Sequence, residues 1–313
     1  MRPVMRSSSR ALPTALGAVL TAATALATPA TGAMAGNAER IVSIGGAVTE
    51  ILYSLGLARR VVAVDSTSIY PEQALKEKPN VGYMRALSPE GVLGLNPSMI
   101  LATEGSGPKE TIAVLKAASV PYVTVPDRFT GEGIVNKIEV IAAAVDASAR
   151  AACLAKAVQA DLAALTRVRG RIEKPLNVMF LLSFMNGRPM VAGRATAADG
   201  VIRLAGAANA ITAYEGYKLV NDEAVIAARP DAVLVMQRDS HPLDAKTVFQ
   251  HPAFALTPAA QEHRFISMNG LYLLGFGPRT ALAARDLATS LYPDVGRDAF
   301  PSERGAAPGE ACR

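Results

Sequence analysis

Residues 88–101 read SPEGVLGLNPSMIL, and residues 221–234 read NDEAVIAARPDAVL. The two segments align without gaps. Each has a helix-capping residue first, a glutamate two positions on, a short apolar helix, an X-Pro break and an apolar run. The cap and the acid favour a helix N-terminus, and the proline stops the helix before a strand. Two unrelated segments could converge on the same favourable helix–strand pattern. However, the two copies lie on either side of one long helix, which favours two similar lobes.

The surrounding sequence alternates short β-rich runs with amphipathic helices, which is typical of parallel α/β architecture. The expected strands are 40–44, 60–65, 98–102, 122–125, 176–182, 232–236 and 264–267. The expected helices are 48–55, 88–95, 108–118, 196–204, 222–228 and 279–291. Residues 147–171 predict one Ala-rich helix that is longer than an ordinary globular helix. We therefore predict two Rossmann-like lobes, residues 36–146 and 172–300, joined by this rigid helix, with the ligand cleft between them.

The N-terminus has the pattern of a secretory signal peptide over residues 1–35. It carries Arg2, Arg6 and Arg10 without any acid, then a short apolar run, then small residues that predict cleavage near Ala35. A membrane anchor is the weaker alternative, because Pro13 and Gly17 break the run. These arginines account for much of the formal charge of +5, so the charge does not indicate nucleic-acid binding. We expect a soluble, exported protein, periplasmic in a cell with two membranes.

The chain has only two cysteines, and the sequence does not predict a disulfide between them. Cys153 falls in a helical pattern, whereas Cys312 falls in a polar Gly/Pro-rich tail, residues 301–313, that we expect to be disordered. Neither cysteine lies at the end of the leader, which excludes a lipid-modified N-terminal cysteine. No later run is long and apolar enough to span a bilayer.

Enzyme signatures are scarce in this sequence. It has no Gly-x-Ser-x-Gly, His-Glu-x-x-His or phosphate-loop motif. Gly45-Gly46 could cradle an anion at a helix N-terminus, although a plain strand-to-helix turn is the better interpretation. His241 and His251 lie ten residues apart in a Pro-containing loop, which is a weak zinc pattern. A binding protein explains these observations better than an enzyme.

The most informative short segment is Tyr83-Met84-Arg85, in an expected loop. A nearby guanidinium favours the anionic form of a phenol, and a phenolate is a hard oxygen ligand suited to ferric iron. Tyrosine is also one of the side chains that hold haem iron. Alternatively, Tyr83 is an ordinary loop tyrosine that packs its ring and leaves its hydroxyl in water.

Six segments together resemble a known family over residues 38–295. They are RIVSIGG (40–46), VDSTS (64–68) with Tyr70-Pro71, NVGYMR (80–85), AGR (192–194) with TAAD (196–199), EGYK (215–218) and NGLYLLGFGPRT (269–280). The chain resembles the haem-binding substrate-binding proteins of bacterial ABC haem importers, within the cobalamin/siderophore-type periplasmic binding proteins. The resemblance implies a non-enzymatic, monomeric carrier that binds haem in the periplasm and delivers it to a permease dimer with its ATPase.

The resemblance also implies roles for single residues. Tyr83 matches the tyrosine that ligates haem iron, Arg85 the residue that supports it, and Arg238, more loosely, an arginine from the second lobe. Glu90 and Glu223 match one acid per lobe that docks on the permease. Arg85, Arg194 and Arg238 are candidates to neutralise the haem propionates, and Met84 is a further haem-contacting candidate.

The sequence departs from the pattern of some relatives, which add a second-lobe histidine as an axial ligand. No histidine precedes His241, so we expect five-coordinate, tyrosinate-ligated haem. Met185 is a weaker candidate for a ligand, because methionine more often packs. The alternatives for the whole protein are cobalamin or ferric-siderophore binding on the same fold, or a periplasmic haem-handling enzyme. The absence of tryptophan and the Tyr-Met-Arg segment speak against the first two. A divalent-metal binder is a further alternative, which the late histidines disfavour.

Overall fold

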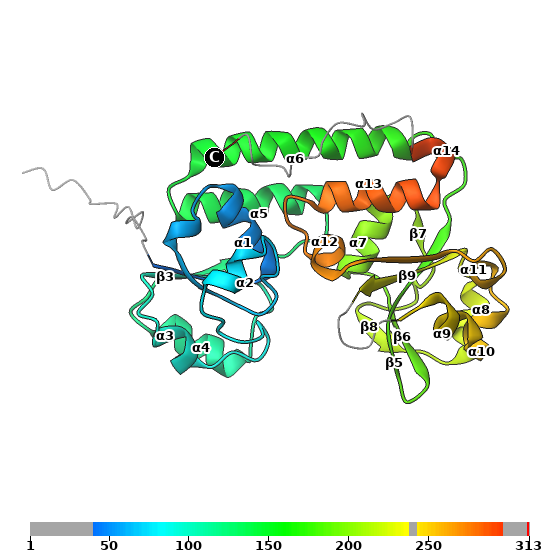
Figure 1. Cartoon of the computed structure of the whole chain (residues 1–313), viewed down its shortest axis with the longest axis horizontal. Helices are drawn as coiled ribbons and strands as arrows, with labels where there is room; N and C mark the ends of the chain where they lie inside the picture. Colours follow the sequence, from blue (N-terminus) through cyan, green and yellow to red (C-terminus); the bar gives the residue numbers. More distant parts are fainter. Residues whose placement is uncertain (1–39, 238–242, 297–311, 313) are drawn as a thin grey trace, which may run out of the picture. The chain divides into compact units, whose positions relative to one another are not determined.

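A four-stranded parallel sheet, in the order β2-β1-β3-β4, forms the centre of the first lobe. The computed structural model describes residues 40–237, 243–296 and 312 (Figure 1). The strands are β1 (Ile41–Ile44), β2 (Val61–Val64), β3 (Met99–Thr103) and β4 (Tyr122–Val125). The helices are α1 (Gly46–Ser54), η1 (Ala58–Arg60), α2 (Gln73–Glu77), α3 (Pro89–Leu93), α4 (Lys109–Ala117) and α5 (Gly131–Ala144). β1 and β3 are buried throughout because their apolar, β-branched runs are covered on both faces.

The second lobe contains a mixed sheet in the order β10-β9-β5-β6-β8, with β7 paired to β5. Its strands are β5 (Asn177–Met185), β6 (Arg188–Ala192), β7 (Ala208–Asn209), β8 (Tyr217–Leu219), β9 (Ala232–Gln237) and β10 (Phe265–Asn269). β6 is antiparallel to both β5 and β8, a departure from the purely parallel series that the sequence predicted. The helices are α7 (Ala197–Leu204), α8 (Asp222–Ala228), α9 (Ala245–Gln250), α10 (Pro252–Ala255), α11 (Pro258–Gln261), α12 (Gly270–Leu274), α13 (Thr280–Leu291) and α14 (Pro293–Gly296).

The predicted long helix is α6 (Ser148–Arg169), which connects the two lobes. Its buried residues recur every three or four positions and form one apolar stripe. α6 packs against α5 and against α13 of the second lobe. The sequence analysis did not predict α5. Figure 1 shows α6 and α13 side by side. The largest hydrophobic cluster contains residues from both sheets and from these three helices. The two-lobe α/β fold class is therefore confirmed. None of the helices within the described ranges combines the length and apolarity needed to cross a bilayer.

The two repeated segments adopt the same local structure. Ser88 accepts a hydrogen bond from the backbone N–H of Gly91, and Asn221 accepts one from Ala224, so each caps its helix. α3 leads into β3, and α8 leads into β9. The predicted helix–strand repeat is thus present in both lobes.

Cys153 and Cys312 form a disulfide, with Cα atoms 5.7 Å apart, so the expectation of unpaired cysteines is wrong. Cys153 lies on the exposed side of α6, and Cys312 is buried. Their separation of 159 residues explains the error, because pairing depends on where the end of the chain lies in space. The predictions for residues 1–35, for residues 301–311, and for Arg238 and His241 lie outside the described residues.

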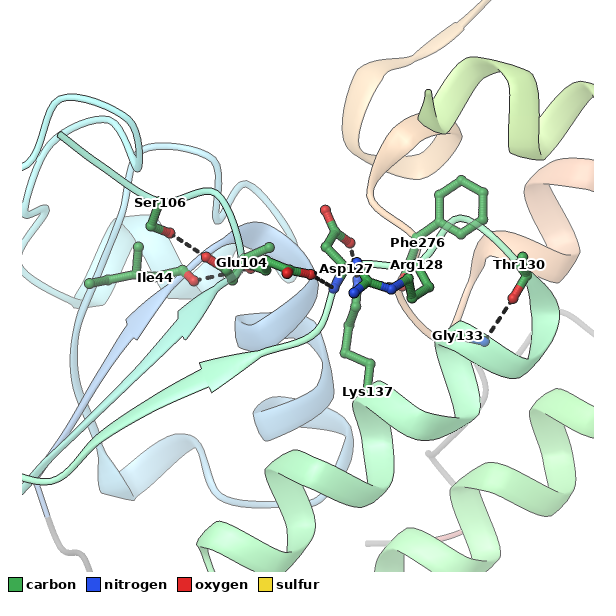
Figure 2. A network of polar contacts seen from close by, with 10 residues as sticks. Ile44, Glu104, Ser106, Asp127, Arg128, Thr130, Gly133, Lys137 and Phe276 are labelled. Atoms are coloured by element: carbon green, nitrogen blue, oxygen red, sulfur yellow. Dashed lines mark hydrogen bonds and ion pairs between the residues drawn. The ribbon is translucent and has the colours of Figure 1, made fainter. Parts of the chain in front are cut away.

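Two polar contacts tie the lobes together. Lys137 of α5, fully buried, forms an ion pair with Asp127 at 2.7 Å and donates a hydrogen bond to the backbone oxygen of Phe276 at 3.2 Å (Figure 2). Glu50 of α1, also buried, accepts hydrogen bonds from Nε and Nη2 of Arg279, both at 3.1 Å. Lys137 and Glu50 belong to the first lobe, whereas Phe276 and Arg279 belong to the second. These two contacts therefore hold the lobes together.

Candidate ligand-binding site

The loop that carries Tyr83 is anchored at the carboxyl end of β2. Backbone hydrogen bonds join Val81 to Val64 and Ser66 to Gly82, both at 2.9 Å. Gly82 has a φ of 94°, which only glycine adopts readily. The loop therefore leaves the sheet edge through a fixed turn. Carboxyl ends of parallel strands are where α/β proteins place their ligands.

A second anchor holds the other side of this loop against the loop that follows β3. The backbone N–H of Gly107 donates to the oxygen of Met84 at 2.9 Å, and that of Leu87 donates to Gly107 at 3.0 Å. Met84 packs on the hydrophobic cluster of the first lobe, so it supports the loop. Tyr83 lies between the two anchors and is 46 % exposed, and Arg85 is also exposed. A phenol and a guanidinium two residues apart are thus presented to a ligand by a well-fixed backbone.

The Gly45-Gly46 turn is a strand-to-helix turn whose amides are already occupied. The N–H of Gly45 donates to Asp65 Oδ1 at 2.8 Å, and that of Gly46 donates to Thr67 Oγ1 at 2.9 Å. The carboxylate of Asp65 also accepts from Ser68 Oγ and from Thr67. The anion-cradle alternative is therefore wrong, and this buried network instead fixes the β1–α1 turn and the start of the loop after β2.

Tyr217, on β8, is a further candidate that the sequence analysis did not select. It lies within electrostatic range of Arg85, so β8 of the second lobe and the Tyr83 loop of the first lobe approach each other here. Burial of its hydroxyl raises the pKa of Tyr217, and the Ala198 amide, the Thr196 hydroxyl and the charge of Arg85 partly oppose that rise. A neutral phenol can donate a hydrogen bond to an acidic ligand group. The only sequence signal was EGYK (215–218), which contributed to the family resemblance.

Met185 ends β5 at the tip of the β5–β6 hairpin, where it is exposed.

The ring of His251 stacks on Phe184 with centroids 4.7 Å apart, and its Nε2 lies 2.7 Å from the backbone oxygen of Gly187. His251 also caps α10 through the N–H of Ala253. His251 therefore has a structural role in bracing the hairpin. The residues that the structure describes contain no group of three or more His, Cys, Asp or Glu suited to a metal ion.

Arg194 is not brought toward Tyr83 by any contact among the described residues. Its Nη1 donates to the backbone oxygen of Thr212 at 2.9 Å, and its Nη2 lies 3.5 Å from Glu215. It lines a cavity of about 710 Å³ at the C-terminal end of α6, together with Arg169 and Arg203. Thr212 and Glu215 both belong to the second lobe. The contacts of Arg194 with them therefore do not support a role for Arg194 as a propionate partner.

Glu90 and Glu223 occupy the same position in their helices, the second residue after the cap. Both are exposed, and neither carboxylate forms an ion pair with another residue in the described part of the chain. A negative charge is favourable at this end of a helix. Each lobe therefore presents one unpaired acid at matching places.

The chain belongs to the periplasmic binding protein family, whose model matches residues 41–270. Among solved structures it is similar to the periplasmic haem-binding protein BhuT in complex with two haems, at 38 % identity and a TM-score of 0.76, covering 82 % of this chain and 98 % of that one. It is similar to apo RhuT, a periplasmic haem-binding protein from Roseiflexus sp. RS-1, at 39 % identity and a TM-score of 0.76, covering 83 % and 100 %.

Curated relatives include ABC importer components and vitamin-binding proteins. An uncharacterised ABC transporter substrate-binding lipoprotein, YvrC of Bacillus subtilis, is 28 % identical over 260 residues, which are 82 % of this chain and 81 % of that one. A vitamin B12-binding protein of Yersinia pestis is 37 % identical over only 84 residues. The family resemblance inferred from the six sequence segments is confirmed.

Proposed function

We propose that this protein binds ferric haem between its two lobes and delivers it to an ABC permease. The observation that carries this proposal is the similarity to two haem-binding proteins, at 38 % and 39 % identity over nearly their whole length. The site agrees with it, because an exposed tyrosine and arginine stand on a fixed loop at the carboxyl end of β2. Haem here is the transported cargo, and no covalent chemistry is required of the protein.

Tyr83 is the proposed iron ligand. It is exposed on a loop whose backbone is braced on both sides by hydrogen bonds, so the backbone that carries the phenol is fixed. Arg85, two residues on, stabilises the phenolate or neutralises a propionate. Tyr217, on β8 of the second lobe, is a further candidate for a ligand contact, because the charge of Arg85 acts on its phenol. Arg238 and Met185 remain candidates for covering the far face of the haem.

Delivery is proposed to use Glu90 and Glu223 as contacts with basic groups of a permease dimer. Two equivalent acids on two similar lobes suit a partner with two-fold symmetry. The protein acts as a monomeric carrier in the periplasm after removal of its leader, and it does not turn over its ligand. The family match and the importer-type relatives support this assignment.

The proposal is tested by titrating the purified exported protein with ferric haem and recording absorbance. Wild type should give a saturable phenolate-to-iron charge-transfer band. Tyr83→Phe should lose that band and weaken binding by more than about 100-fold, since changes to groups that merely support a metal ligand already cost up to about 100-fold. The matched control is Tyr217→Phe, which removes a tyrosine hydroxyl of the second lobe and should keep the band.

Each outcome decides between assignments. If Tyr217→Phe loses the band and Tyr83→Phe keeps it, the iron ligand lies on the second lobe. If neither variant changes the spectrum, Met185 or His241 must be examined as the iron ligand. Absence of any haem binding by wild type refutes the function. Titration with cyanocobalamin then tests the alternative that the short match to a vitamin B12-binding protein favours.

A further inference from the structure

The two docking glutamates cannot by themselves hold this protein on a permease. An exposed ion pair changes an equilibrium constant by less than about five-fold, whereas micromolar binding requires a factor of about one million. Charges at an interface mainly guide encounter and orientation, and affinity comes from apolar side chains that become buried at the centre of the contact. The proposed docking face should therefore carry apolar side chains beside each glutamate.

Three large aliphatic side chains are exposed on the helices next to Glu90 and Glu223. Val114 of α4 is 50 % exposed, Ile226 of α8 is 43 % exposed, and Leu256, directly after α10, is 74 % exposed. Isolated exposed aliphatics are common on protein surfaces and need no explanation. Their position in the repeated architecture is what makes these three informative.

Val114 and Leu256 lie in corresponding segments of the two lobes, and Ile226 lies on the helix that carries Glu223. α4 lies between β3 and β4 and packs on α3, which carries Glu90. The segment with α10 lies between β9 and β10, and α10 packs on α8, which carries Glu223. Ile226 is three residues from Glu223 and therefore on the same helix face. The first lobe thus combines Glu90 with one exposed aliphatic side chain, Val114, and the second combines Glu223 with two, Ile226 and Leu256.

From this arrangement we infer that Val114, Ile226 and Leu256 are apolar docking contacts, which together with the glutamates form two matching acid-plus-aliphatic patches. This inference rests on the proposed function. The occupant is a two-fold symmetric membrane permease, each subunit of which offers a basic group beside an apolar depression. The repeat places one such patch on each lobe, which a symmetric partner requires and which a single peptide or a flat lipid surface does not.

The test measures binding of the full exported protein to the importer's permease–ATPase complex in lipid nanodiscs. Leu256→Ser should weaken binding about 5- to 40-fold, in proportion to the exposed part of a leucine that docking would bury. Val114→Ser and Ile226→Ser should each weaken it about three- to ten-fold. The matched control is Ile69→Ser, because Ile69 is 42 % exposed but lies in the loop before α2.

Salt dependence separates the apolar contacts from the charged ones. Glu90→Gln and Glu223→Gln should reduce the dependence of Kd on ionic strength. Leu256→Ser should raise Kd by the same factor at every salt concentration. The inference is overturned if the serine variants at 114, 226 and 256 bind the nanodiscs as tightly as Ile69→Ser, or if wild type does not bind them.

Haem titration of the same variants keeps the two proposals apart. The serine variants at 114, 226 and 256 should bind haem as wild type does, because these residues lie outside the loops at the carboxyl end of β2. A wild type that binds haem but shows no role for the three aliphatics refutes the docking inference alone. A wild type that does not bind haem refutes the proposed function instead.

Discussion

Removing the acid of the Lys137–Asp127 pair should destabilise the protein more than removing the base. Lys137 has a fully buried side chain, whereas that of Asp127 is 24 % exposed, and their charged atoms are 2.7 Å apart. Asp127→Asn keeps the shape but leaves a buried ammonium without a counter-charge. The loss of one partner from a buried pair costs about 3–5 kcal/mol. Because asparagine still accepts a hydrogen bond, we expect about 3 kcal/mol.

Lys137→Met leaves a carboxylate that water can reach, and it fills the vacated space with an apolar side chain of similar length. The remaining cost is the unpaired backbone oxygen of Phe276, which loses its 3.2 Å hydrogen bond. An unsatisfied buried acceptor costs about 1–3 kcal/mol, so we expect about 1–2 kcal/mol here. The double variant removes both charges, and its cost should be well below the sum of the two single costs.

Thermal unfolding followed by circular dichroism measures this asymmetry. At about 2–4 °C per kcal/mol for a domain of this size, Asp127→Asn should lower Tm by about 6–12 °C and Lys137→Met by about 2–8 °C. Glu104→Gln is the control, because its ion pair with Arg128 (Figure 2) is exposed and should change stability by less than about 1 kcal/mol. Equal losses for the two variants, or a larger loss for Lys137→Met, would refute the reasoning.

Three further predictions follow from other contacts. Thiol titration of the denatured, unreduced protein should find no free thiol; reduction of the Cys153–Cys312 bond, which spans 159 residues, should lower stability by up to about 5 kcal/mol. Burial and the hydrogen bond to Asp286 raise the pKa of Tyr272. The stability from this phenol is therefore present below about pH 10 and lost as pH rises above it, and alkaline unfolding of Tyr272→Phe should show a weaker pH dependence. Because iron displaces a proton from the ligating phenol, haem affinity should fall as pH is lowered in a titration series; an affinity that does not change with pH would argue against phenolate ligation.

Sequence patterns predicted elements with clear local signals and missed those whose signals depend on neighbours. β4 and α8 have the predicted limits, because a cap or an X-Pro step defines their ends. α5 was missed since Gly131 and Gly133 weaken its first turn as a helical pattern. Gly133 is required there because an added Cβ would lie 2.3 Å from the backbone oxygen of Arg128. Gly133 is needed because another part of the backbone approaches it closely, and helix propensities carry no information about such a contact.

The β5–β6 hairpin did have a local signal that the sequence analysis did not use. Asn186-Gly187 joins two β-rich runs, and both residues have positive φ, 51° and 73°, as a two-residue hairpin turn requires. The consequence for the site is direct. The hairpin makes part of the second sheet antiparallel and brings β8, with Tyr217, to its edge. A purely parallel series gives no reason to place Tyr217 at this edge.

The residues that face each other across the lobes could not be predicted from sequence, because that pairing is set by contacts between distant segments. Arg279 and Glu50 are 229 residues apart, yet their buried pair, with the Lys137 contact, sets how the lobes meet. The same contacts constrain release. The largest apolar cluster includes both sheets, so a free hinge motion would have to expose core surface and break the Glu50–Arg279 ion pair and the hydrogen bond from Lys137 to Phe276. We infer that the lobes separate little on their own and that the permease supplies the work of release. The two proposed docking patches place one contact with the permease on each lobe.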